Sequence, residues 1–122
     1  ADGYNWGTTQ TREKDGWDSR WRSFRDIFTP IHSRLRTLAP GKPFFVFETA
    51  TVTEGGDKEV WIQEAVRTAG EWNIEGFIWF QVNKEQDWRF GTGAGNDYVS
   101  TLRKRLGCAA SALEKMMGAK SK

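Results

Sequence analysis

The sequence predicts an α/β fold built on a small parallel sheet. Two short apolar runs, residues 44–47 and 76–80, are bounded by turn-forming residues, which is typical of strands buried on both faces. Segments with helical spacing of apolar residues lie between the two runs and after the second. Because buried strands alternate with helices, parallel strands joined by helical crossovers are the expected architecture.

The first third of the chain is expected to form a loop and then a helix. Residues 1–16 are rich in Gly, Thr, Asn and Asp, which favour turns. A helix with Asp18 or Ser19 as its N-cap follows, since apolar side chains recur at three- and four-residue spacing as far as Leu38. We expect Pro30 to kink or divide this helix, and the two prolines in residues 39–43 to end it.

The remaining elements follow the βα alternation. The strand of residues 44–47 ends in Glu48, and Asp57 is a plausible N-cap for the next helix, which ends near Gly70. The second strand, residues 76–80, precedes a polar loop over residues 81–96, whose length is typical of functional loops. A third helix is predicted from Asp97 to Leu113, before a frayed end. One face of the middle helix is expected to hold Val60, Trp61, Ala65, Val66 and Ala69.

Composition excludes several classes of protein. The longest uncharged apolar runs are a handful of residues, whereas a membrane-spanning helix needs about 20, so we expect no membrane partner. Cys108 is the single cysteine and His32 the single histidine, which excludes an internal disulfide and a structural zinc site. We therefore expect no metal and no cofactor. The first residues do not resemble a signal peptide either.

The aromatic content favours binding to flat ligands. Seven Trp, eight Phe and two Tyr make 14% of the residues, and the tryptophans lie next to polar residues and glycines. Such aromatic faces commonly bind sugar rings or bases. One alternative is a non-catalytic carbohydrate-binding module, although such modules are usually β-sandwiches. Another is a basic nucleic-acid-binding domain using residues 103–122, which hold six basic and one acidic side chain; a solvated helix face explains that charge better, so no nucleic acid is expected.

Candidate functional residues lie at strand ends, where active residues gather in parallel α/β folds. We expect Glu48 to be partly desolvated, because it follows an apolar strand. A fold retains such a carboxylate when hydrogen bonds or a function compensate for the lost solvation; a salt-bridged or helix-capping Glu is the alternative. Trp79 could form the floor of a pocket or simply pack in the core. If residues 2–6 are a strand end and its loop, Tyr4 could donate a hydrogen bond to a carboxylate, and Asn5 and Trp6 could contact a ligand; a frayed terminus is the alternative.

Six motifs in order resemble a known enzyme family. They are Asp-Gly-Tyr-Asn-Trp, Trp-x-x-Phe, Lys-Pro-Phe-Phe-Val-Phe-Glu, Asp-Lys-x-x-Trp-Ile, Gly-Phe-Ile-Trp-Phe and Asp-Trp-Arg. Together they resemble the C-terminal part of glycoside hydrolase family 26, whose members are (β/α)8 barrels and mostly β-mannanases. The resemblance covers residues 2–90 and implies that about strands six to eight of such a barrel are present. It implies that Glu48 is the catalytic nucleophile, that Tyr4 is a hydroxyl beside it and that Trp79 is a sugar platform.

The implied mechanism is double displacement. Retaining glycosidases use two carboxyl groups about 5 to 5.5 Å apart, one as nucleophile and one as acid/base. A hydrogen bond from Tyr4 would favour the ionised form of Glu48. In the family the acid/base comes from the fourth strand, which this chain lacks, and Glu54, Glu85 and Asp87 do not match its position.

The resemblance also implies the partners and the domain organisation. The Asp87, Trp88 and Arg89 loop is expected to bind sugar or brace the site, with a surface ion pair as the alternative. Residues 1–106 would be a partial catalytic domain and residues 107–122 a helix with a frayed tail, since a closed barrel needs roughly 250 residues. We expect a truncated chain that hydrolyses little alone, a β-glycan such as β-1,4-mannan as ligand, the N-terminal part of the barrel as partner, and an extracellular location.

Overall fold

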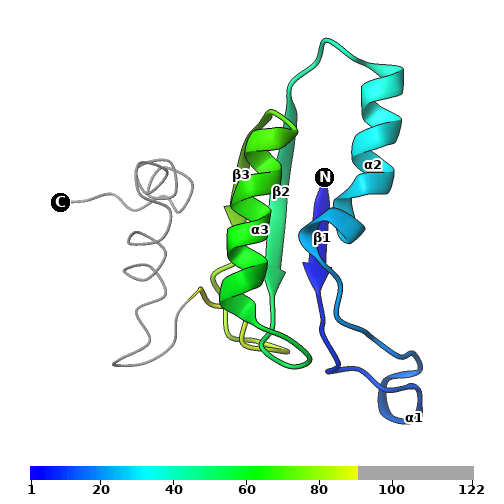
Figure 1. Cartoon of the computed structure of the whole chain (residues 1–122). Helices are drawn as coiled ribbons and strands as arrows, with labels where there is room; N and C mark the ends of the chain where they lie inside the picture. Colours follow the sequence, from blue (N-terminus) through cyan, green and yellow to red (C-terminus); the bar gives the residue numbers. More distant parts are fainter. Residues whose placement is uncertain (91–122) are drawn as a thin grey trace, which may run out of the picture.

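The computed structural model of the protein describes residues 1–90, which form a three-stranded parallel sheet with two long helices (Figure 1). The strand order is β1-β2-β3, and both neighbouring pairs are parallel. This confirms the predicted α/β character and differs from the β-sandwich expected of a carbohydrate-binding module. The predicted third helix, the boundary after residue 106 and the basic segment of residues 103–122 lie outside the described residues. The elements are β1 (Asp2–Asn5), α1 (Arg12–Asp15), α2 (Phe24–Leu38), β2 (Phe44–Thr51), α3 (Lys58–Glu71) and β3 (Ile74–Trp79).

The prediction of a loop over residues 1–16 is wrong in its first part, because β1 lies there. Its polar sequence carries no strand signal, and the strand depends on pairing with β2, in which Tyr4 lies opposite Ala50. Gly3 lets this strand approach α2 closely. A Cβ atom at Gly3 would lie 2.5 Å from Ile27 Cγ2 and 3.0 Å from Phe28 Cζ, closer than carbon atoms pack.

Helix α2 begins later than predicted and continues through Pro30. Ser23, not Asp18 or Ser19, is the N-cap, and it forms a capping box with Asp26. Pro30 has no N–H to donate to the carbonyl of Asp26, four residues earlier. The guanidinium of Arg22 donates to that carbonyl at 2.6 Å instead, so the acceptor that the proline leaves free is satisfied.

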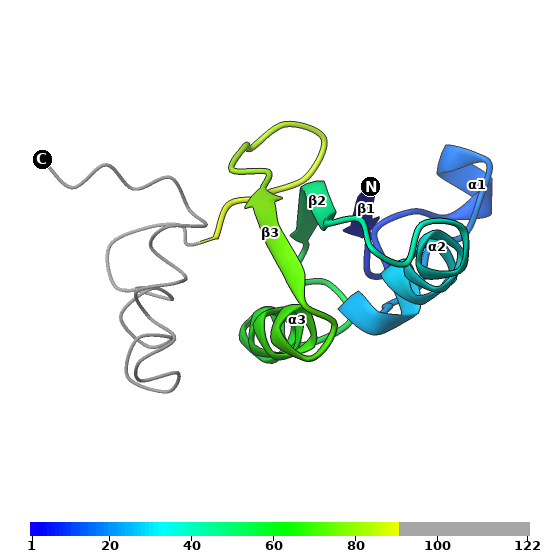
Figure 2. The same ribbon diagram turned by 90° about the horizontal axis from the view of Figure 1, so that it is seen from above.

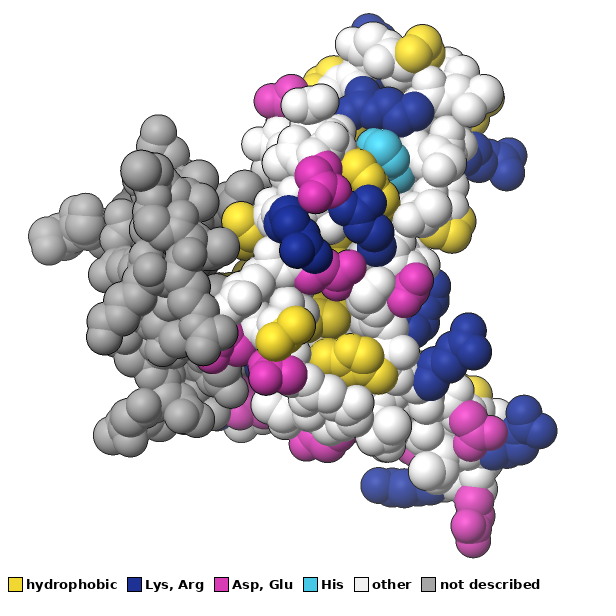
Figure 3. Space-filling model, in the orientation of Figure 1, with side chains coloured by type: hydrophobic (Ala, Val, Ile, Leu, Met, Phe, Trp, Pro, Cys, Tyr) yellow, Lys and Arg dark blue, Asp and Glu magenta, His cyan; other side chains and the backbone are white. Residues whose placement is uncertain are grey.

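Both long helices pack on one face of the sheet (Figure 2). The N-cap of α3 is Asp57, as predicted, but Val60 is exposed and does not belong to the buried face. Lys, Arg, Asp and Glu side chains intermix over the outer surface of the helices (Figure 3). No helix within residues 1–90 is long and apolar enough to cross a bilayer. The buried core between helices and sheet includes Phe24, Phe28, Val46, Trp61, Ile62, Ala65, Ala69, Phe77 and Trp79.

The other face of the sheet is open in the described part of the chain. Phe45, Phe47 and Ile78 are exposed there, with 59% of Phe47 accessible. The prediction that both strands are buried on both faces is therefore wrong for residues 1–90. Their continuous apolar sequence is typical of strands covered on two sides, and here the helices cover one side only.

Candidate active site

A β-bulge in β2 directs Glu48 to the open face of the sheet. Val46 pairs with Phe77 and Thr49 with Trp79, so two residues of β2, Phe47 and Glu48, lie opposite the single Ile78 of β3. Side chains alternate between faces in a regular strand, which would send Phe47 and Glu48 to opposite sides. The extra residue lets both point to the open side. The prediction that the strand ends in Glu48 is wrong, because β2 continues to Thr51, and contrary to the predicted desolvation Glu48 is exposed.

Tyr4 and Glu48 are joined by a short hydrogen bond. The Tyr4 hydroxyl donates to Glu48 Oε2 at 2.6 Å. The strand register explains the contact, because Tyr4 pairs with Ala50, and Glu48 is two residues before Ala50 on the same face of β2. Burial raises the pKa of the Tyr4 phenol, and so do the hydrogen bond to Glu48 and the negative charges of Glu48, Asp2 and Glu85. Tyr4 therefore stays protonated at neutral pH and acts as the donor.

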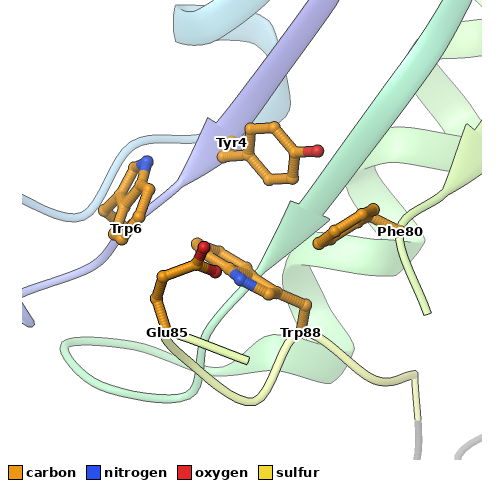
Figure 4. Close-up of a pocket in the computed structure, with 5 residues that line it drawn as sticks. All are labelled: Tyr4, Trp6, Phe80, Glu85 and Trp88. Atoms are coloured by element: carbon orange, nitrogen blue, oxygen red, sulfur yellow. The ribbon is translucent and has the colours of Figure 1, made fainter. Parts of the chain in front are cut away.

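An aromatic hollow adjoins this pair at the carboxyl end of the strands. It has a volume of about 170 Å³ and is lined by Tyr4, Trp6, Phe80, Glu85 and Trp88. We call it the Tyr4 hollow. Figure 4 shows the four rings around the space and the Glu85 carboxylate reaching toward it from the loop after β3. Trp6 meets Trp88 edge to face, with ring centroids 4.8 Å apart, and Tyr4 lies 5.1 Å from Trp88. Apolar rings with one carboxylate are suited to a ligand that has both apolar faces and hydroxyl groups.

The loop of residues 80–90 is anchored to the core by its tryptophan and phenylalanine side chains. Trp88 and Phe90 are buried, and the indole N–H of Trp79 donates to the Trp88 carbonyl at 2.8 Å. The Phe90 amide donates to Gln81 Oε1 at 2.8 Å, which closes the loop on itself. The wall of the Tyr4 hollow is therefore part of the folded core.

Lys58 provides a second anchor for the same loop. Its buried ammonium donates to the Asp87 carbonyl at 3.2 Å, and burial lowers the Lys58 pKa to about 8, against the raising effects of the Asp87 and Glu54 charges. The Asp87 carboxylate receives two hydrogen bonds from Arg89, at 2.9 and 3.0 Å. Asp87 and Arg89 thus form an ion pair within the loop, as the alternative for these residues had it, while sugar binding by this loop stays a prediction.

The loop carboxylates are poor candidates for a proton donor. The pKa of Glu85 is lowered by a hydrogen bond from its own backbone amide and by Lys84, and the pKa of Asp87 is lowered chiefly by the Arg89 hydrogen bonds. A general acid in a retaining glycosidase needs the opposite shift. Both carboxylates therefore stay ionised near neutral pH.

Two predicted ligand-contacting residues are located elsewhere. Asn5 is fully buried: its Nδ2 donates to Thr51 Oγ1, and its Oδ1 accepts from the amides of Gly7 and Arg22. The whole amide of Asn5 is used to join β1 to its neighbours, so the structure gives this residue a position inside the fold, and its contact with a ligand stays a prediction. Trp79 points to the helix side, where it packs on Trp61 and Phe90, so its position is that of a core residue and not of a platform.

Sequence reasoning missed Phe80 as a lining residue. Phe80 directly follows Trp79, and strand alternation places neighbouring residues on opposite faces, so a prediction that assigned Trp79 to the ligand side had to assign Phe80 to the other side. The packing of Trp79 against Trp61 of α3 settles the orientation, and this contact has no local sequence signal. Within the described residues, no three His, Cys, Asp or Glu side chains gather in a way that could hold a metal ion.

Comparison with known proteins relates the chain to a glycoside hydrolase. No family model matches the chain. It is 35% identical over 113 residues to Endoglucanase H of Acetivibrio thermocellus. The match covers 90% of this chain but only 11% of that protein, so the chain is similar to a small segment of it.

Proposed function

We propose that the chain is the part of a retaining glycoside hydrolase that carries its nucleophile, Glu48. The observation that carries the proposal is the 2.6 Å hydrogen bond from Tyr4 to Glu48 Oε2, between adjacent parallel strands and beside an aromatic hollow. The relation to a glycoside hydrolase supports the reaction class. Membership of glycoside hydrolase family 26 is part of the proposal and rests on the order of the sequence motifs.

The proposed chemistry assigns one task to each oxygen of Glu48. Oε2 accepts the Tyr4 hydrogen bond, and Oε1 attacks the anomeric carbon, while the bond from that carbon to the leaving oxygen breaks with its electron pair. Tyr4 orients the carboxylate, and its phenol keeps its own proton because burial and the hydrogen bond to Glu48 raise the Tyr4 pKa. Water then attacks the glycosyl-enzyme ester at the anomeric carbon and releases Glu48.

The proton for the leaving group must come from another part of the polypeptide. An acid/base about 5 to 5.5 Å from Glu48 is required, and both loop carboxylates favour the ionised state. We infer that residues 1–106 belong to a (β/α)8 barrel whose other strands supply the acid and cover the open face. The exposed Phe45, Phe47 and Ile78 support this inference, since parallel sheets are normally covered on both faces.

The proposed substrate is a β-linked polysaccharide. The family resemblance points to β-1,4-mannan, and the name of the Acetivibrio thermocellus relative points to a glucan. An enzyme acting on such polymers is expected outside the cell, and we propose an extracellular location on that ground.

A mechanism-based label tests the nucleophile without the missing acid. In a 2,4-dinitrophenyl 2-deoxy-2-fluoro-β-glycoside the leaving phenolate needs no proton, and fluorine slows hydrolysis of the ester that forms. Incubation of the 122-residue chain with the glucoside or the mannoside should add one fluoroglycosyl group. Mass spectrometry of peptides should locate it on Glu48.

Variants sharpen this test. Glu48→Gln should abolish the label, and Tyr4→Phe should slow labelling by about tenfold or more, as expected for loss of a charge-assisted hydrogen bond. Glu75→Gln changes an exposed carboxylate on the same sheet and should label like the parent chain. The same protein should release no reducing sugar from mannan or β-glucan. Labelling at another residue, or unchanged labelling of Glu48→Gln, would contradict the proposal.

A further inference from the structure

A second hollow lies beside the Tyr4 hollow and shares two of its residues. It has a volume of about 430 Å³, is also lined by Tyr4 and Trp6, and extends over Trp17, Asp18, Ser19, Arg20 and Arg22. We call it the Trp17 hollow. Its size falls in the range of about 300–1,000 Å³ that is typical of ligand sites. Because Tyr4 and Trp6 line both hollows, a ligand in one can continue into the other without leaving the surface.

Trp17 presents an exposed ring in this second hollow. It is 45% accessible and meets Trp6 edge to face, with centroids 6.1 Å apart and the planes at 79°. Trp6 also meets Trp88 edge to face in the Tyr4 hollow. Trp6 is therefore the indole common to the two hollows, and each hollow has a further indole of its own.

The segment that carries Trp17 is held by several hydrogen bonds, although most of it is exposed. Gln10 and Ser19 exchange two hydrogen bonds, with the Ser19 amide donating to the Gln10 carbonyl at 3.1 Å and the Gln10 amide to Ser19 Oγ at 2.9 Å. The Asp18 carboxylate accepts from the Arg12 amide at 2.7 Å. Gly16, in the left-handed region with φ of 80°, ends α1 directly before Trp17. A pre-ordered segment loses little conformational entropy when a ligand binds.

The chemistry of the lining fits a sugar ring. A pyranose has an apolar face of C–H groups that can lie on an indole, and hydroxyl groups around its edge that both donate and accept hydrogen bonds. Trp17 offers the flat apolar surface, Arg20 and Arg22 offer donors, and Asp18 offers an acceptor. Arg22 and Asp18 also hold the Asp26 carbonyl and the Arg12 amide, which fixes the charged side chains in place beside the Trp17 ring.

We propose that the Trp17 hollow is a second sugar-binding subsite, which holds another ring of the same β-linked glycan whose reacting ring lies near Glu48 and the Tyr4 hollow. The glycan chain then passes Trp6 between the two hollows. This inference rests on the proposed function, and it adds that the site takes an oligosaccharide of several rings in preference to a single sugar or a disaccharide.

Titration calorimetry on the 122-residue chain tests the subsite, with cellobiose, cellohexaose, mannobiose and mannohexaose as probes. One hexasaccharide should bind more tightly than its disaccharide. Trp17→Ala should weaken hexasaccharide binding by about tenfold, equivalent to about 1.4 kcal/mol, and leave disaccharide binding within twofold. Trp17→Phe keeps a flat ring and should restore most of the affinity. Trp6→Ala should weaken binding of both lengths.

Controls separate the possible results. Phe45→Ala removes a ring of similar exposure, 41%, near the start of β2, and should leave both affinities unchanged. Urea titration should give Trp17→Ala the same unfolding midpoint as the parent, so that any loss of binding is local. If Trp17→Ala binds the hexasaccharide like the parent, the subsite is refuted and the proposed function stands. If the parent binds none of the four probes, the subsite is refuted together with the glycan-binding role of the Tyr4 hollow, while the labelling of Glu48 still tests the nucleophile.

Discussion

The buried amide of Asn5 gives a sharp test of whether this residue supports the fold or contacts a ligand. Asn5→Ala removes three hydrogen bonds, of 2.8 Å to Thr51 Oγ1, 3.2 Å from the Gly7 amide and 2.9 Å from the Arg22 amide. A buried polar group that loses its partner costs about 1–3 kcal/mol. Gly7 is buried, so its amide bears this cost in full, whereas Arg22 is exposed and water can replace its partner. We expect a loss of about 2–4 kcal/mol in the free energy of unfolding.

Urea unfolding followed by far-UV circular dichroism measures this loss. For a chain of this size, it should lower the urea midpoint by more than about 1 M. Asn83→Ala is the matched control, because Asn83 is exposed and its bridge to Asp87 uses the backbone; its unfolding free energy should stay within about 0.5 kcal/mol of the parent. A parent-like midpoint for Asn5→Ala, together with weaker oligosaccharide binding, would refute the structural role and restore the role predicted from the sequence.

Two further predictions concern Lys58 and Gly3. The folded-state pKa of Lys58 is about 8, below its ordinary 10.5, so between pH 8 and 10 the unfolded chain binds more protons and stability should rise with pH. Because the folded chain is already half titrated at pH 8 and the unfolded chain still mostly protonated at pH 10, we expect a rise of about 1–2 kcal/mol in urea titrations at pH 8, 9 and 10, which Lys58→Met should abolish; a flat parent profile would contradict this. Gly3→Ala should cost about 1–3 kcal/mol through contact with Ile27, whereas Gly76→Ala, whose Cβ would lie 3.9 Å from Phe45, should unfold at or above the parent midpoint.

The sequence predicted the parts of the fold that have local signals. Capping chemistry and hydrophobic periodicity predicted Asp57 as an N-cap, the helix after it and the parallel strands on either side. The structure has all of these features. The start of α2 was misplaced because Trp21 fits the helical spacing, although its ring packs against Gly56 in the loop before α3. Such a contact between segments far apart in the chain has no signature in either segment.

The candidate site was predictable in its residue types but not in its orientation. Tyr4 and Glu48 were singled out, and the structure brings them within hydrogen-bond distance. Strand β1 carries no periodic apolar pattern, and the face on which Glu48 lies depends on a bulge that no glycine or proline marks. The prediction put Trp79 on the ligand side, and alternation would then put Phe80 on the helix side, which is the reverse of what the structure shows.

The extra residue in β2 also has a practical meaning for protein engineering. A transfer of the Tyr4–Glu48 pair to another parallel sheet would have to include the bulge at Phe47 and Glu48. In a regular strand of the same sequence, alternation from Val46 would direct the Glu48 side chain to the helix face. Conversely, deletion of Phe47 should remove the bulge and keep Glu48 on the open face, because Glu48 would then alternate regularly with Val46 and Thr49. A chain without Phe47 would therefore show whether the Tyr4–Glu48 contact needs the bulge itself or only a carboxylate on that face.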